Sequence, residues 1–265
     1  MTTIAVISDI HANLPALECV LEDVARREGI IGTYHLGDLV GYAPWPNEVV
    51  ELLREKGIPG IAGNYDSTVA TRYEHCGCGY EDPRDVELAH LSFSWTLRHT
   101  SEETRAYLGT LPFRMDLRPW GGHLAGPRIT LIHGNPVLNT VYWTEDRPDS
   151  FCLQMAERLG ARPGDTIVFG HTHRPWHREI EGIHFVNAGS VGRPKDGDWR
   201  ACYLLLHLGK SEEAGEAYHA RPEFVRVEYD RQRAQEGVLA SDLPDEFAEV
   251  LETAGGKREE RRVGR

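Results

Sequence analysis

Apolar positions at the beginning of the chain follow two periods, one typical of buried strands and the other typical of amphipathic helices. Strands are predicted at 3–8, 33–37 and 59–63, and helices at 14–28 and 46–57. The first of these helices carries apolar residues on one face: Leu14, Leu17, Val20, Leu21 and Val24. Strands that alternate with helices in this way predict an α/β fold.

The pattern changes after the third predicted strand. From 67 to 128 it indicates helices and loops, and Thr100 and Glu103 have the spacing expected of a capping box before one of these helices. Further strands are predicted at 128–134, 165–170, 182–189, 201–208 and 223–229. We therefore predict a single domain over 1–230, with stacked sheets flanked by helices and a helical, cap-like insertion at 67–128. Residues 231–265 are expected to form a C-terminal helical segment and a charged, frayed tail.

Composition and charge restrict the classes of function. A chain of 265 residues with 40% hydrophobic content can bury a sizeable core. Its apolar runs are far shorter than the roughly 20 residues that span a bilayer, and no secretory signal is visible, so we expect a cytoplasmic protein without a membrane partner. Five cysteines, an odd number, indicate reduced thiols. The net charge of -12 argues against broad binding to nucleic acid, so an anionic substrate would need a local positive centre.

Side chains that can bind metals follow five of the predicted strands. They are Asp9, His11, Asp38, Asn64, His133, His171 and His173. Ligands of open α/β sheets bind outside the carboxyl ends of the strands, and two ions that share one carboxylate need about this number of donors. Within Asp9-x-His11 and His171-x-His173, an extended backbone would let the flanking side chains converge. The pattern therefore predicts a binuclear metal site, whereas His35 is interpreted as strand packing.

These segments together resemble the calcineurin-like metallophosphoesterases. The matching blocks, in the order of the family, are "DIH" at 9–11, "GD" at 37–38, "GNYD" at 63–66, "HG" at 133–134 and "GHTH" at 170–173. The match extends from residue 4 to about 192 and is most similar to the small bacterial and archaeal phosphodiesterase branch. The resemblance implies a four-layer αββα sandwich, with the metals at one edge of the two sheets.

The resemblance also implies roles for the seven side chains. One metal would be held by Asp9, His11 and His173, and the other by Asn64, His133 and His171, with Asp38 as the bridge. The cofactors would be two divalent ions, with manganese the first choice and iron, zinc, nickel or cobalt as alternatives. The implied reaction is hydrolysis of a phosphodiester or other small phosphorylated molecule by a metal-bridging hydroxide. A dinucleoside polyphosphate hydrolase is the alternative enzyme, and a non-catalytic scaffold would be marked by missing ligands.

The third block also contains Tyr65 and Asp66, which together with Asp38 and Asn64 form the candidate catalytic set. Many family members carry histidine where Tyr65 stands, as a general acid or a phosphate contact, so the identity of the leaving-group acid is open here. Structural packing is the other interpretation of Tyr65. Asp66 is interpreted as a group that orients its neighbours, with an exposed turn carboxylate as the alternative.

Three further residues are candidates for substrate binding, and two cysteines have a separate interpretation. Arg174, Arg193 and Lys195 follow predicted site-facing turns and are expected to contact a substrate phosphate, with solvated loop charge as the alternative. Cys76 and Cys78 form a C-x-C pair without a second pair at zinc-site spacing, which favours buried or loop thiols over metal binding or redox sensing. The sequence leaves the substrate and the oligomeric state open.

Overall fold

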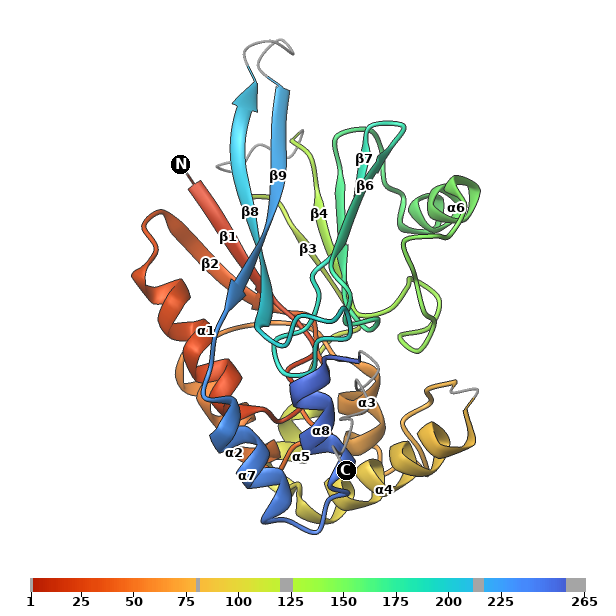
Figure 1. The fold of residues 1–265 in the computed structure, drawn as a ribbon. Coiled ribbons are helices and arrows are strands. Elements are labelled where there is room, and N and C mark those ends of the chain that lie inside the picture. Colours follow the sequence, from red (N-terminus) through yellow and green to blue (C-terminus); the bar gives the residue numbers. More distant parts are fainter. Residues whose placement is uncertain (1, 80–81, 120–125, 212–216, 256–265) are drawn as a thin grey trace, which may run out of the picture.

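The computed structural model describes residues 2–79, 82–119, 126–211 and 217–255. Two stacked sheets form its centre (Figure 1). The four-stranded sheet has the order β2-β1-β8-β9, and the five-stranded sheet has the order β3-β4-β5-β7-β6. The strands of the first sheet are β1 (Thr2–Ile7), β2 (Ile30–His35), β8 (Ala201–Ser211) and β9 (Ala217–Val227). Those of the second are β3 (Arg114–Leu117), β4 (Ile129–Ile132), β5 (Thr166–Phe169), β6 (Trp176–Ile180) and β7 (Ile183–Asn187).

Helices cover the outer faces and one end of the sheets (Figure 1). They are α1 (Leu14–Arg26), α2 (Pro46–Glu55), α3 (Asn64–Ala70), α4 (Pro83–His99), α5 (Glu102–Leu108), α6 (Asp149–Leu159), α7 (Arg231–Leu239) and α8 (Glu246–Thr253). Helices α1 and α2 flank the four-stranded sheet, and α6 flanks the other sheet. Helices α3, α4, α5, α7 and α8 gather at one end of both sheets. None of the described helices combines the length and apolarity needed to cross a membrane.

Alternation along the strands explains the layers. In β1, Ile4 and Val6 join a buried cluster with residues of both sheets, including Val168 and Leu204, so this face packs between the sheets. The alternate residues, Ala5 and Ile7, belong to the cluster that includes residues of α1 and α2. A third cluster joins the outer face of the five-stranded sheet to α6. Side chains two residues apart share a face of a strand, so the arrangement confirms the predicted αββα sandwich.

The prediction of a strand at 59–63 is wrong. Only one bridge forms there, between His35 and Gly60. Pro59 has no amide hydrogen to donate to a ladder, and a Cβ on Gly60 would lie 2.3 Å from the ring of His35. The segment therefore passes close to β2 without becoming a strand.

Two edge strands were not predicted. In β6 only the ends, Trp176 and Ile180, are buried, and the three residues between them are polar. In β3, which pairs with β4 in antiparallel register, no residue is fully buried. Because β3 lies within 67–128, the helical part of the predicted insertion ends with α5. The chain after 230 forms α7 and α8, and the predicted frayed tail falls on 256–265, outside the described residues.

Candidate metal centre

The seven candidate metal-binding residues lie at the same end of the two sheets, in the turns that follow their strands or at the start of a helix. Two follow β1, one follows β2, one begins α3, one follows β4 and two follow β5. They are Asp9, His11, Asp38, Asn64, His133, His171 and His173, and every one of them is buried. The convergence predicted from the strand ends is therefore present in the structure.

The backbone of five of these residues is not extended. The φ angles are 51° at Asp9, 49° at His11, 51° at Asp38, 66° at His171 and 60° at His173. The expectation of an extended D-x-H and H-x-H backbone is thus wrong, because these residues occupy the left-handed region that non-glycine residues rarely adopt. Hydrogen bonds between turns hold them there, among them His11 N–H to the Asp38 carbonyl at 2.9 Å. Such strain is concentrated at functional sites.

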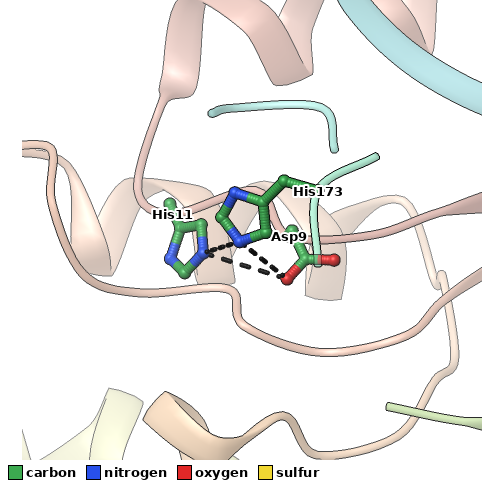
Figure 2. A group of neighbouring side chains, drawn as sticks. All are labelled: Asp9, His11 and His173. Carbon is green, nitrogen blue, oxygen red and sulfur yellow. Dashed lines mark hydrogen bonds and ion pairs between the residues drawn. The ribbon is translucent and has the colours of Figure 1, made fainter. Parts of the chain in front are cut away.

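Asp9, His11 and His173 point toward one another and form the first group (Figure 2). The Nε2 atoms of His11 and His173 are 3.0 Å apart, and Asp9 Oδ1 lies 3.2 Å from His173 Nε2. Each Nδ1 faces a backbone carbonyl, that of Val40 at 3.2 Å from His11 and that of Arg193 at 2.6 Å from His173. Because a carbonyl only accepts, each Nδ1 carries the hydrogen and each neutral ring offers its Nε2 lone pair to the group.

Asp38, His133 and His171 form the second group. His133 Nε2 lies 3.4 Å from Asp38 Oδ2, and its Nδ1 donates to the Leu36 carbonyl at 2.8 Å. His133 Nε2 also lies 3.2 Å from Asn64 Oδ1, which brings the amide into this group. Among the described residues, the buried Nε2 of His171 has no hydrogen-bond partner, so it is available as a donor to an ion.

Asp38, a member of the second group, also faces the first group. Its Oδ2 is 3.7 Å from His11 Nε2 as well as 3.4 Å from His133 Nε2, and its Oδ1 accepts from the backbone N–H of Tyr65 at 2.9 Å. This is the position that a bridging carboxylate would occupy.

Burial and the two carboxylates determine the charge of the centre. Burial lowers the pKa of His11 and of His171 to about 3, so both rings are neutral and able to bind a metal. At His133 burial opposes protonation, but the charge of Asp38 outweighs it and raises the pKa to about 9. Burial also opposes ionisation of Asp9, yet its close contacts with His173, and then with His133 and His11, outweigh burial and hold its pKa below the usual range. An ion that binds here would displace the proton of His133.

Asp66 contacts the backbone of two turns that carry candidate metal-binding residues. Its Oδ1 accepts from Leu39 N–H and its Oδ2 from Gly63 N–H, both at 2.9 Å, so the carboxylate joins the two turns that carry Asp38 and Asn64. Asp66 is fully buried, which excludes the exposed-turn interpretation. Burial, followed by the charge of Asp38, raises the pKa of Asp66 to about 7.

The two cysteines of the C-x-C pair orient a candidate ligand. Asn64 Nδ2 donates to the carbonyl of Cys76 at 2.9 Å and to Sγ of Cys78 at 3.3 Å. With its nitrogen held in this way, the amide directs Oδ1 toward His133. Both thiols are free, and Cys76 is buried while Cys78 lines the small pocket above the metal-binding residues. The interpretation as buried or loop thiols agrees with these positions.

The same pocket contains two of the three predicted substrate contacts. Arg193 and Lys195 line it, whereas Arg174 lines a separate cleft with Glu145 and Asp146. Burial, and then the charge of Arg193, lowers the pKa of Lys195 to about 8. Two cationic side chains thus face the metal-binding residues, and the third does not.

Aromatic side chains line the pocket as well. Tyr65 is buried, with its ring edge-on to His11 at 5.6 Å and its hydroxyl 3.4 Å from Ser92 Oγ. Tyr42 and Tyr142, which sequence reasoning missed, also line the pocket, and Tyr142 stacks on His171 at 4.5 Å. A signal existed for Tyr42, because it closes the "GDLVGY" stretch, but none marks Tyr142.

Comparison with known proteins places the chain in a family. Residues 2–211 match the calcineurin-like phosphoesterase superfamily domain, and the chain belongs to this superfamily of phosphoesterases, as predicted. It is 31% identical to the uncharacterized protein MJ0912 of Methanocaldococcus jannaschii, over 94% of this chain and 96% of that protein. It is 28% identical to phosphodiesterase YfcE of Escherichia coli, over 75% of this chain and 84% of that protein.

Solved structures agree with this assignment. A metallophosphoesterase from Sphaerobacter thermophilus is 27% identical and superposes with a TM-score of 0.69, over 96% of this chain and 99% of that chain. The predicted metallophosphoesterase fold is thereby confirmed.

Proposed function

We propose that this protein is a phosphoesterase that uses two divalent metal ions to hydrolyse a phosphodiester or another small phosphorylated molecule. The observation that carries the proposal is the pair of neighbouring groups with Asp38 between them. In each group the candidate donor atoms lie within 4.8 Å of one another. The name of the relative YfcE, a phosphodiesterase, supports a diester as the first substrate to test.

The residues present fit two metal ions. Asp9, His11 and His173 would hold one ion, and Asn64, His133 and His171 the other, with Asp38 between them. The buried Nε2 of His171, which has no hydrogen-bond partner among the described residues, and the carbonyl contacts that fix His11 and His173 support this assignment. Imidazole with carboxylate suits several transition metals, and manganese is our first choice. When bound, two such ions would polarise phosphate oxygens and lower the pKa of a water molecule that attacks phosphorus.

The chain supplies the other requirements of hydrolysis. Arg193 and Lys195 provide positive charge beside the metal-binding residues, where they would bind the phosphate of a substrate although the whole chain carries a net charge of -12. The buried Asp66 would hold the turns of Asp38 and Asn64 in register through its two amide contacts. Tyr142, stacked on His171, would restrict the motion of that ring.

The test is an activity screen on protein that has been stripped with a chelator and reloaded separately with Mn²⁺, Fe²⁺, Zn²⁺, Ni²⁺ or Co²⁺. The substrates are phosphomonoesters, linear and cyclic diesters, and dinucleoside polyphosphates. We expect metal-dependent hydrolysis of a diester and about two metal ions per chain by elemental analysis. Preferred cleavage of dinucleoside polyphosphates would favour the alternative enzyme. Binding of two ions without hydrolysis of any substrate would contradict the proposal.

A further inference from the structure

A second pocket lies next to the metal centre, between α4 and α8. Its volume is about 270 Å³, and its apolar walls are formed by Leu88 and Ala89 of α4 and by Phe247 and Val250 of α8. Ala89 and Phe247 are buried, and Leu88 is half-buried. Asp85, exposed at the beginning of α4, is the acidic residue of the lining. We call this hollow the α4–α8 pocket.

The α4–α8 pocket shares part of its wall with the metal centre. Tyr42, Arg193 and Lys195 line both hollows. The Tyr42 ring packs edge-on against His11 at 4.9 Å and against Phe247 at 5.3 Å. The Arg193 guanidinium lies 4.0 Å from the Tyr42 ring centroid and 5.9 Å from that of Phe247. A ligand held at the metal centre would therefore have this pocket as its immediate neighbour.

The helices that form the pocket are tied to the site. An ion pair between Arg84 and Glu246 joins the beginnings of α4 and α8. At the other end of α8, the Ala254 carbonyl accepts from Gly197 N–H at 3.0 Å, two residues after Lys195. The Tyr42 backbone N–H donates to Ser92 Oγ of α4 at 3.0 Å. The walls are thus positioned by contacts that do not depend on a ligand.

The charge and polarity of the lining residues change from the metal centre to the far end of the α4–α8 pocket. Positive charge is found where the two hollows meet, the walls beyond it are apolar and aromatic, and the exposed Asp85 carboxylate would repel a second anionic group. We propose that the α4–α8 pocket binds an uncharged aromatic group attached to the substrate phosphate, an aryl or a nucleobase, through contact with Phe247 and Leu88. This inference rests on the proposed function, and it narrows the substrate to aromatic esters or nucleotides.

The proposal gives a role to a segment outside the family domain. The match to the superfamily ends at residue 211, whereas Phe247 and Val250 belong to α8 (Glu246–Thr253). The metal-binding residues would therefore lie within the family domain, whereas the substrate-selecting pocket would combine α4 of that domain with α8 outside it.

The test measures binding by calorimetry, with Mn²⁺-loaded protein and two pairs of probes. Benzylphosphonate is compared with methylphosphonate, and adenosine monophosphate with ribose 5-phosphate, so that each pair differs mainly in its aromatic group. We expect the aromatic member of at least one pair to bind roughly tenfold tighter or better. The pair with the larger ratio identifies an aryl group or a nucleobase as the occupant. Equal affinities within both pairs would overturn the inference.

Variants locate the effect in the pocket. Phe247→Ala and Leu88→Ala should each reduce the aromatic preference severalfold and leave the affinity for methylphosphonate unchanged. Phe247→Tyr should retain the preference, because it retains the ring. Glu252→Ala changes an exposed residue of the same helix and is the matched control. A full preference in a folded Phe247→Ala variant that binds two metals would also overturn the inference.

A parallel assay separates this inference from the proposed function. The same preparations are tested for hydrolysis of bis(p-nitrophenyl) phosphate. Hydrolysis without any aromatic preference in binding contradicts the α4–α8 pocket and leaves the phosphoesterase proposal intact. An aromatic preference that depends on Phe247, without hydrolysis of any substrate, supports the pocket and contradicts the proposed reaction.

Discussion

The metal centre and the α4–α8 pocket lie side by side but are built in different ways. Every candidate metal-binding side chain is buried, and most belong to tight turns held by backbone hydrogen bonds. The pocket is formed by the sides of two helices and by the two loops that carry Tyr42 and Arg193, and Asp85 at its edge is exposed. A rigid, buried set of donors is suited to chemistry that is the same for every substrate. A semi-exposed apolar hollow is suited to the part of a substrate that varies.

This difference leads to separate expectations for the two regions. Changes at the metal centre should alter turnover of all substrates by a similar factor, because each substrate presents the same phosphate to it. Changes in the pocket should alter the ratio between substrates. The following variants test that division, in order of decreasing effect.

The largest effect is expected from Asp38→Ala. The variant removes the carboxylate that lies between the two groups, and loss of several kcal/mol of transition-state stabilisation would lower kcat/KM by roughly a thousandfold. Metal content should fall in the same preparation. Asp242→Ala, at an exposed carboxylate, is the matched control. A folded Asp38→Ala variant with near-normal activity, or one that loses activity on only some substrates, would contradict the division.

A smaller effect is expected from substitution of Asp66, because this carboxylate contacts backbone amides and is not one of the proposed metal-binding groups. Asp66→Ala leaves the buried amides of Leu39 and Gly63 without their acceptor, at a cost of about 1–3 kcal/mol for each in unfolding free energy. Metal affinity should fall by about 10- to 100-fold, as is usual for groups that orient ligands. Asp66→Asn keeps one oxygen acceptor, so its stability and metal affinity should lie between those of the wild type and of Asp66→Ala. Unchanged Mn²⁺ affinity in a titration of Asp66→Ala would show that the carboxylate serves folding alone.

Tyr65 lies at the boundary between the two regions, since its ring contacts both His11 and Tyr42. A phenol with a pKa of about 10 is a poor proton donor near neutrality compared with an imidazole of about 6.5. Aryl diesters and dinucleoside polyphosphates, whose leaving groups need little protonation, should therefore be hydrolysed faster than alkyl phosphomonoesters. Tyr65→His should raise kcat/KM for alkyl monoesters by up to about tenfold, and raise it less for aryl diesters. Equal changes for both substrate classes would support packing as the only role of Tyr65.

The smallest effect on activity is expected from His35, a buried histidine of β2 that belongs to neither group. His35→Leu should leave metal content and kcat/KM within about twofold. Its effect should appear in stability, because burial lowers the pKa of His35 from 6.5 to about 4. The unfolded chain then binds a proton that the folded chain does not, so His35 costs stability as pH falls from 6.5 toward 4.

The size of this effect follows from the pKa difference. Between pH 7 and pH 4, the wild type should lose about 3 kcal/mol more unfolding free energy than His35→Leu. Chemical denaturation of both proteins at each pH, with a chelator present, measures the difference. If the unfolding free energies of the two proteins change with pH in the same way, His35 does not contribute to the pH dependence of stability.

The candidate donors and their end of the sheet could be predicted because the signals are local. Each motif follows directly after a buried apolar run, and the carboxyl ends of parallel strands lie at one edge of a sheet. The left-handed backbone of Asp9 and His11 could not be predicted in this way. It depends on hydrogen bonds to the turn after β2, and that turn comes close only when the sheet has formed.

The two arginines that follow turns show the same limit. Arg193 and Arg174 look alike in sequence, yet only Arg193 lines the metal pocket. Secondary structure has the same limit. A strand was predicted at 59–63 where none forms, and the polar strand β6 was not predicted. Short segments with few apolar residues are decided by their neighbours in space.

The sequence by itself determined the chemistry of this protein: which donors are present, in what order, and on which edge of an α/β fold. Only the tertiary structure decided that α4 and α8 enclose a pocket beside those donors. The physical reason is that Leu88 and Phe247 are apolar residues on helices, with the same pattern in sequence as residues that simply fill a core. Whether such a residue packs in the interior or lines a cavity depends on what faces it, and here the facing residues come from distant parts of the chain.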